Sequence, residues 1–88
     1  MSIVLFVDDE PAILAGLTRA LRREAYIVRT ATSAKDARTI LAEEAVDTVV
    51  SDKLMAVESG SELLAWLSQE YPSIVRIMLT GEASSRTE

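Results

Sequence analysis

The stretch IVLFVDDE at residues 3–10 decides the fold, because an unbroken apolar run stops abruptly at acidic residues. An apolar run without polar alternation is typical of a strand that is buried on both faces, as in the parallel sheets of α/β proteins. Pro11 follows directly and suits the first turn of a helix. The start of the chain therefore predicts a buried parallel strand that leads through an acidic turn into a helix.

The same unit of strand and helix repeats along the chain. Further strands are expected at residues 26–30, 47–51 and 74–79, which are rich in β-branched and apolar residues. Helices are expected at residues 11–25, 33–41 and 59–71, and the second and third of them begin with serine in a capping-box pattern. Strands that alternate with helices imply right-handed crossovers and a parallel sheet. The predicted fold class is α/β, a doubly wound parallel sheet, in one domain over residues 1–88.

Composition narrows the possible functions. The net charge of −5 and the lack of a long basic cluster argue against binding to nucleic acid or to an anionic membrane. Cysteine and histidine are both absent, which excludes disulfides, thiolate zinc sites and catalysis by Ser-His or Cys-His pairs. The first apolar run is too short to span a membrane and has no basic segment before it. We therefore expect a cytoplasmic protein whose metal ligands, if it has any, are oxygen atoms.

Acidic and hydroxyl side chains gather at the carboxyl ends of the expected strands. Asp8 and Asp9 follow the first strand, Asp52 follows the third, and Thr80 follows the fourth. Ligand sites of open α/β sheets lie at this edge, so these side chains should converge if the first and third strands are neighbours. Close carboxylates repel one another unless a cation lies among them, and all-oxygen ligation suits Mg²⁺ or Mn²⁺. A carboxylate beside such an ion can attack a phosphoryl group, and Asp52 is the candidate nucleophile.

The order and spacing of these residues resemble the receiver domains of two-component response regulators. The resemblance runs from about residue 3 to residue 81 and is carried by residues 7–11, by residues 51–55 with Gly60 eight positions after Asp52, and by residues 79–81. It implies a flavodoxin-like receiver fold with a sensor histidine kinase as phosphodonor. It also implies an output domain or effector, whose nature the sequence does not identify.

The resemblance also assigns roles to individual residues. Asp52 is implied to be the phosphoacceptor, and Thr80 the switch hydroxyl that moves to hydrogen-bond the phosphoryl group. The implied Mg²⁺ ligands are Asp8, which would reach the ion mainly through water, Asp9, Asp52 and the backbone carbonyl of Leu54. Gly60 is implied to shape the loop after Asp52.

The sequence departs from the family pattern in two places. Ala56 stands where the family usually has proline, which should loosen the loop after Asp52. The sequence also stops before a fifth strand, so the family's phosphate-pairing lysine and aromatic switch residue are missing, together with the helices that flank that strand. On this interpretation residues 1–88 are the N-terminal three quarters of a receiver domain. The strand at residues 74–79 would then be a free edge, and we expect self-association through it.

Two alternatives to a phosphoaccepting switch follow from the same residues. A truncated receiver could act as a dimerisation or assembly module without switching. A Mg²⁺-dependent phosphohydrolase with an aspartyl nucleophile, of the haloacid dehalogenase type, would carry its second aspartate two positions after the first. Here Asp8 and Asp9 are adjacent, which disfavours that enzyme class. The expected function is therefore signalling and not enzymatic.

Overall fold

Four parallel strands form a single sheet in the computed structural model, which describes residues 2–55 and 57–79. The strands are β1 (Ile3–Val7), β2 (Ile27–Ala31), β3 (Thr48–Asp52) and β4 (Val75–Leu79). They lie in the order β2-β1-β3-β4, and each pair of neighbours is parallel. All four lie within one residue of their predicted bounds. The order makes β1 and β3 neighbours, which is the arrangement that brings Asp8, Asp9 and Asp52 to one place.

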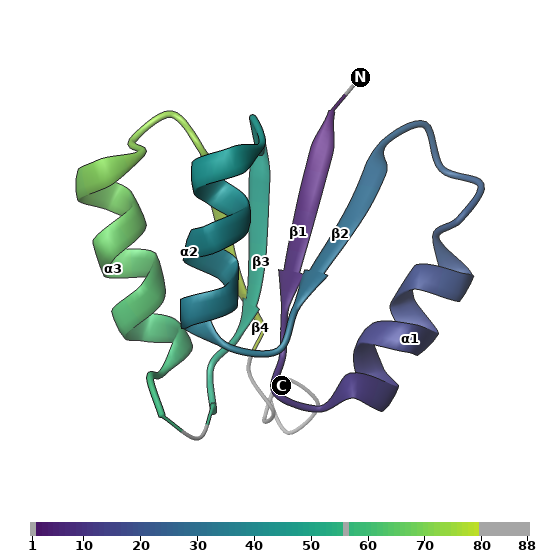
Figure 1. The fold of residues 1–88 in the computed structure, drawn as a ribbon, viewed down its shortest axis with the longest axis horizontal. Coiled ribbons are helices and arrows are strands. Elements are labelled where there is room, and N and C mark those ends of the chain that lie inside the picture. The colour runs from purple at the N-terminus through teal and green to yellow at the C-terminus, as the bar shows by residue number, and fades with distance from the viewer. Residues whose placement is uncertain (1, 56, 80–88) are drawn as a thin grey trace, which may run out of the picture.

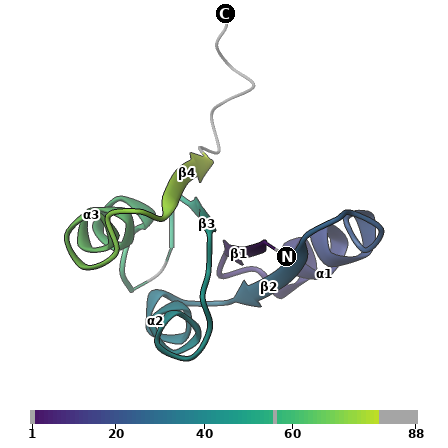
Figure 2. The ribbon, with the colours of Figure 1, turned by 90° about the horizontal axis from the view of Figure 1, so that it is seen from above.

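The three helices lie on both faces of the sheet, although they do not cover the two faces equally. They are α1 (Pro11–Ala20), α2 (Ala34–Glu43) and α3 (Gly60–Glu70). Helices α2 and α3 lie on one face, and α1 lies on the other (Figures 1 and 2). This is the doubly wound α/β arrangement that the sequence predicts. None of the helices in the described part of the chain has the length and apolarity that a membrane crossing requires.

The helix ends show where local sequence signals succeed and where they fail. The Ser33 side chain accepts a hydrogen bond from the Asp36 backbone N–H at 3.1 Å, and Ser59 with Glu62 forms a complete capping box. By contrast, α1 ends at Ala20 and not at residue 25 as predicted. Leu21 leaves the helical conformation, yet it still packs against the core on the α1 face. Its apolar spacing therefore reflects a core contact made after the helix has ended.

The core is divided by the sheet into two clusters. Leu5 and Val7 of β1 belong to the larger cluster under α2 and α3, together with the fully buried Leu63 and Leu67. Phe6, between them in β1, packs on the other face against Leu14, Val50 and neighbouring partly buried residues. Burial of both faces confirms the interpretation of the apolar run. Each fully buried leucine contributes roughly 1.5–3 kcal/mol to stability relative to an exposed one.

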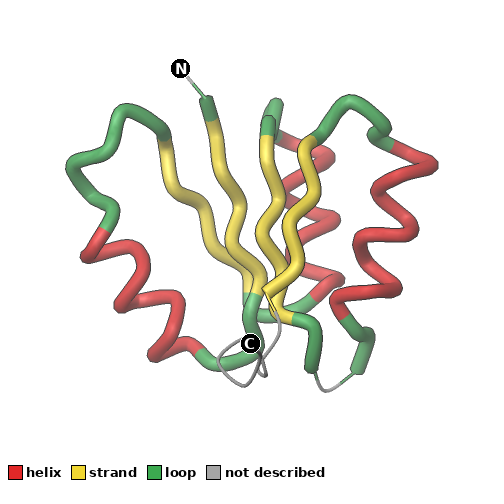
Figure 3. Tube along the Cα trace, turned by 180° about the vertical axis from the view of Figure 1, so that it is seen from behind, coloured by secondary structure: helices red, strands yellow, loops and turns green. Residues whose placement is uncertain are grey.

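Strand β4 is an edge strand with apolar side chains in solvent. Val75, Ile77 and Leu79 are 57%, 43% and 51% exposed. Ile77 pairs in register with Val50, so its side chain lies on the α1 face of the sheet. Within residues 2–55 and 57–79, no helix covers β3 and β4 on that face (Figure 3). Among the described residues β4 therefore has a strand neighbour on one side only, and its pairing with another chain stays a prediction.

Candidate functional site

Three aspartates meet at the carboxyl edge of the sheet. Asp8 and Asp9 follow β1, and Asp52 is the last residue of the neighbouring strand β3. Each offers one carboxylate oxygen, and these oxygen atoms all lie within 4.8 Å of one another. Asp8 and Asp52 are half-buried, and Asp9 is exposed. The structure thus brings together the three carboxylates that the sequence predicts to converge.

Asp8 is held in place by two backbone hydrogen bonds. Its N–H donates to the carbonyl of Ala31 in β2 at 3.1 Å. Its carboxylate Oδ1 accepts from the backbone N–H of Glu10 at 2.9 Å. Glu10 is the residue that caps α1, and its own side chain makes no capping bond. The carboxylate of Asp8 therefore organises the turn into α1 and presents its remaining lone pairs towards the site.

Asp52 is fixed mainly through its backbone. Its carbonyl oxygen accepts a hydrogen bond from the Ser51 hydroxyl at 3.0 Å. A Cβ atom added to Gly60 would lie only 2.1 Å from the same carbonyl oxygen. The Gly60 N–H donates to the Lys53 carbonyl at 3.0 Å, which closes the loop after the strand. Only glycine permits this close approach, so Gly60 does shape the loop, as the family resemblance implies.

The donor set at this edge fits a hard divalent cation. Three carboxylates at this spacing repel one another, and a bound cation relieves that repulsion. Oxygen ligands in a solvent-open site suit Mg²⁺, which keeps several of its waters when it binds proteins. Leu54 follows in the adjoining segment, and the role of its carbonyl as a ligand stays a prediction. Thr80, the predicted switch hydroxyl, lies outside the described residues.

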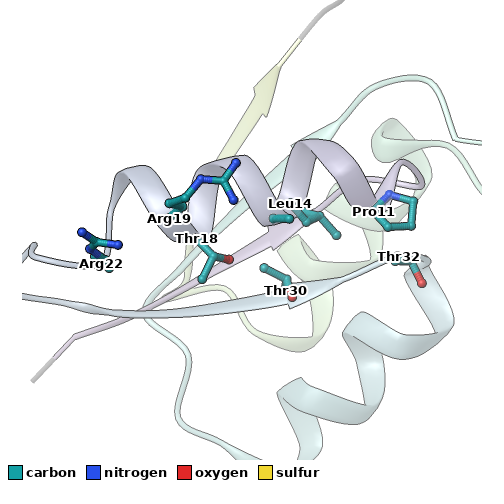
Figure 4. Close-up of a pocket in the computed structure, with 8 residues that line it drawn as sticks. Pro11, Leu14, Thr18, Arg19, Arg22, Thr30 and Thr32 are labelled. Atoms are coloured by element: carbon teal, nitrogen blue, oxygen red, sulfur yellow. The ribbon is translucent and has the colours of Figure 1, made fainter.

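Two hollows on the surface were not predicted from the sequence, and one of them adjoins the aspartates. The smaller, of about 250 Å³, is lined by Asp9 and Glu58 together with residues from the start of α2. The larger, of about 520 Å³, lies between α1 and β2 and is lined by Leu14, Thr30 and Arg22 among others (Figure 4). None of the three aspartates lines the larger hollow. The smaller hollow is therefore the one that adjoins the candidate site.

An ion pair beside the smaller hollow was likewise not predicted from the sequence. Arg38 of α2 binds Glu58, which lies twenty positions later in the segment between β3 and α3. The hydrogen bond from Arg38 holds the pKa of the Glu58 carboxyl below its usual range. No local motif links these two residues, because their contact depends on how α2 packs beside β3 and α3. The sequence offers no signal by which the pair could be found.

Comparison with known proteins places the chain in a family. The model of the response regulator receiver domain matches residues 4–88. Transcriptional regulatory protein GlrR of Escherichia coli (strain K12) is 37% identical over 81 residues, which are 92% of this chain and 18% of that protein. The chain thus spans less than a fifth of the length of this curated relative.

Solved structures agree with the family match. The signal receiver domain of an HD domain-containing protein from Pseudomonas fluorescens Pf-5 superposes with a TM-score of 0.89 at 36% identity, covering 93% of this chain and 66% of that one. Response regulator protein TrrA from Thermotoga maritima, solved in complex with Mg²⁺-BeF, gives a TM-score of 0.86 at 30% identity, covering 98% and 75%. The fold, the acidic edge and the family match agree, and the chain belongs to the response regulator receiver domain family.

Proposed function

We propose that this domain is a phosphoaccepting switch of a cytoplasmic two-component phosphorelay, with Asp52 as the acceptor and Mg²⁺ held by Asp8, Asp9 and Asp52. The observation that carries the proposal is the convergence of three carboxylate oxygens within 4.8 Å at the ends of two adjacent strands. The Mg²⁺-BeF complex of the similar protein TrrA supports the choice of ion. The proposed role is binding and switching and not turnover of a substrate.

The proposed reaction transfers a phosphoryl group to a carboxylate oxygen of Asp52. That oxygen attacks phosphorus while the bond from phosphorus to the donor breaks, and the donor leaves with the electron pair of that bond. With a phosphohistidine of a sensor kinase as donor, the leaving group is an imidazole that takes up a proton. Mg²⁺, when bound, neutralises charge on the phosphoryl oxygens. Ser51 and Gly60 contact the backbone carbonyl of Asp52 and so hold the strand end from which its carboxylate projects.

The proposed partners are a sensor histidine kinase as donor and an output domain or effector as recipient of the signal. GlrR, which resembles this chain over its receiver segment, is named as a transcriptional regulator, and this supports a regulatory output. The domain itself carries a net charge of −5. Nucleic-acid binding is not part of the proposed role of this region, because its net negative charge repels a phosphate backbone.

Titration with Mg²⁺ tests the metal site. We expect weak binding that perturbs the backbone NMR signals of Asp9 and Asp52, and Asp9→Asn should weaken it by about tenfold or more, because one ligand charge is lost. Asp36→Asn is the matched control, since Asp36 is an exposed aspartate in α2 that lies outside the acidic cluster. Unchanged spectra on addition of Mg²⁺, or equal losses of affinity in both variants, would contradict the proposed site.

Self-association through β4 is a second candidate function, as an assembly module, and it rests on the exposed edge. Unpaired backbone groups and apolar side chains on an edge strand promote pairing with another chain. Ile77→Lys should shift the chain towards monomer, because lysine on an edge opposes pairing. Light scattering coupled to size-exclusion chromatography measures this. A wild-type monomer of 9.6 kDa at high micromolar concentration would rule out this candidate.

A further inference from the structure

Arg38 binds Glu58 through both terminal nitrogen atoms of its guanidinium group. Nη1 donates to Oε1 at 2.8 Å, and Nη2 donates to Oε2 at 2.5 Å. Two parallel bonds between planar groups are stronger and more directional than a single ionic contact. Both side chains are part-buried, so solvent screens this pair less than a pair on the open surface. The contact is therefore specific enough to fix the position of Glu58 relative to α2.

The indole ring of Trp66 in α3 packs against the same guanidinium group. The Arg38 Cζ atom lies 4.7 Å from the ring centroid, within the range of a cation–π interaction. Trp66 in turn meets Tyr71 edge to face with centroids 5.8 Å apart, and it packs against the main core cluster. Arg38 is thus held by an anion along its edge and by an aromatic face. We call Arg38, Glu58 and Trp66 the α2 clip.

The segment that the α2 clip holds buries little apolar surface of its own. Val57 is 97% exposed and Leu54 is 69% exposed. In the described part of the segment Met55 packs against the main core cluster, whereas the exposed residues gain little from hydrophobic packing and depend on polar contacts for their position. The Ser59 capping box anchors the end of the segment at α3. The ion pair with Arg38 restricts Glu58, which directly precedes Ser59, and so fixes the segment one residue closer to Asp52.

The segment also contacts the phosphoacceptor side chain directly. The backbone N–H of Leu54 lies 3.4 Å from the Asp52 carboxylate oxygen Oδ1 and donates to it. A shift of the segment would therefore turn the Asp52 carboxylate or leave it without this donor. Glu58 lines the same 250 Å³ hollow as Asp9. Glu58 of the α2 clip thus belongs to the segment that follows Asp52 and lines a hollow that Asp9 also lines.

Arg38 and Glu58 of the α2 clip each stabilise the charged form of the other. The lowered pKa of Glu58 arises first from its hydrogen bond to Arg38, against which partial burial acts in the opposite direction. A carboxyl whose folded-state pKa is lowered adds stability above its ordinary pKa and loses it as the pH falls through the lowered value. Both groups are therefore ionised, and the hydrogen bonds between them stay formed, throughout the neutral pH range.

We infer that Arg38 and Glu58 are positioning residues for the acidic site: the α2 clip fixes the segment after Asp52 and thereby sets the affinity of the three aspartates for Mg²⁺. The inference rests on the proposed function of that site. A purely electrostatic role makes the opposite prediction for one variant. Without Arg38, an unpaired Glu58 would add negative charge beside Asp9 and would tighten the binding of a cation.

The test compares Arg38→Met, Glu58→Gln and the double variant by NMR-detected Mg²⁺ titration of the whole chain. Each single variant should weaken Mg²⁺ binding roughly threefold to tenfold. The double variant should bind Mg²⁺ with the same affinity as the single variants, because each single substitution already breaks the pair between Arg38 and Glu58. Arg29→Met is the matched control: it removes the pair between Arg29 and Glu44, which involves neither the segment nor the aspartates, and should leave the affinity unchanged.

Hydrogen exchange without metal provides a second measurement. The amides of Leu54 and Gly60, which donate within the segment, should exchange faster in both single variants than in Arg29→Met. Unchanged exchange and unchanged Mg²⁺ affinity would overturn the inference, and so would tighter binding in Arg38→Met. If the wild-type chain bound no Mg²⁺, the proposed function would fail, and the exchange rates would still decide whether the α2 clip holds the segment.

Discussion

Asp52→Asn is expected to abolish phosphoryl transfer to this chain. The substitution replaces a carboxylate nucleophile by a neutral amide of the same shape, and no acyl phosphate can form on it. Intact-mass measurement after incubation with acetyl phosphate and Mg²⁺ should show at most one added phosphoryl group on the wild-type chain and none on the variant. Labelling of the wild type should be slow, because a small donor brings no protein surface to position it.

Two controls test whether labelling requires the Asp52 carboxylate and the metal ion in particular. Asp36→Asn removes an exposed carboxylate of α2 and should leave labelling intact. A chelator should prevent labelling of the wild-type chain, since the three carboxylates would then repel the phosphoryl oxygens. Labelling that survives Asp52→Asn, or that proceeds equally well in the chelator, would exclude the proposed acceptor or the proposed role of the ion.

Gly60→Ala is expected to destabilise the fold strongly, because the added methyl group would collide with the backbone of Asp52. The added Cβ would lie 2.1 Å from the carbonyl oxygen of Asp52 and 2.9 Å from its carbonyl carbon. Both are backbone atoms, so relief of the clash requires β3 and α3 to move apart. We expect the free energy of unfolding to fall by about 3 kcal/mol or more, which is a large part of the total for a small domain. Urea denaturation followed by circular dichroism measures this.

Gly16→Ala is the matched control for that substitution. Gly16 lies within α1, and a Cβ atom added there would meet nothing within 4 Å. Alanine is the better helix former, so this variant should gain up to about 1 kcal/mol. Equal effects of the two substitutions would show that the approach of Gly60 to Asp52 is less tight than the structure has it. If Gly60→Ala remains folded, its Mg²⁺ affinity should also fall, because the backbone of Asp52 is displaced.

Local patterns were sufficient to predict most of the secondary structure. The apolar run of β1, the serine caps of α2 and α3, and the alternation of strands with helices each depend on a few neighbouring residues. The prediction that α1 ends at residue 25 was wrong for a physical reason. Leu21 continues the apolar spacing of the helix, but it reaches the core from a turn, and spacing alone cannot distinguish these two geometries.

The acidic site was predictable because strand ends of a parallel sheet meet at one edge. Once β1 and β3 are neighbours, residues that directly follow or end those strands have to lie close together, and Asp8, Asp9 and Asp52 do. The choice of neighbours was the uncertain step, and the strand order resolved it. The roles of the Leu54 carbonyl and of Thr80 remain predictions from the resemblance.

The sequence by itself determined the strands, the fold class and the acidic edge, because these follow from periodicity and from chemistry at strand ends. Only the tertiary structure decided which distant side chains touch. The α2 clip joins Arg38 of α2 to Glu58, 20 positions later, and to Trp66 of α3. The approach of Gly60 to the Asp52 carbonyl depends on how α3 is set against β3. Such contacts arise from the packing of whole elements, whose relative positions are fixed by the sum of many weak interactions and not by any local pattern.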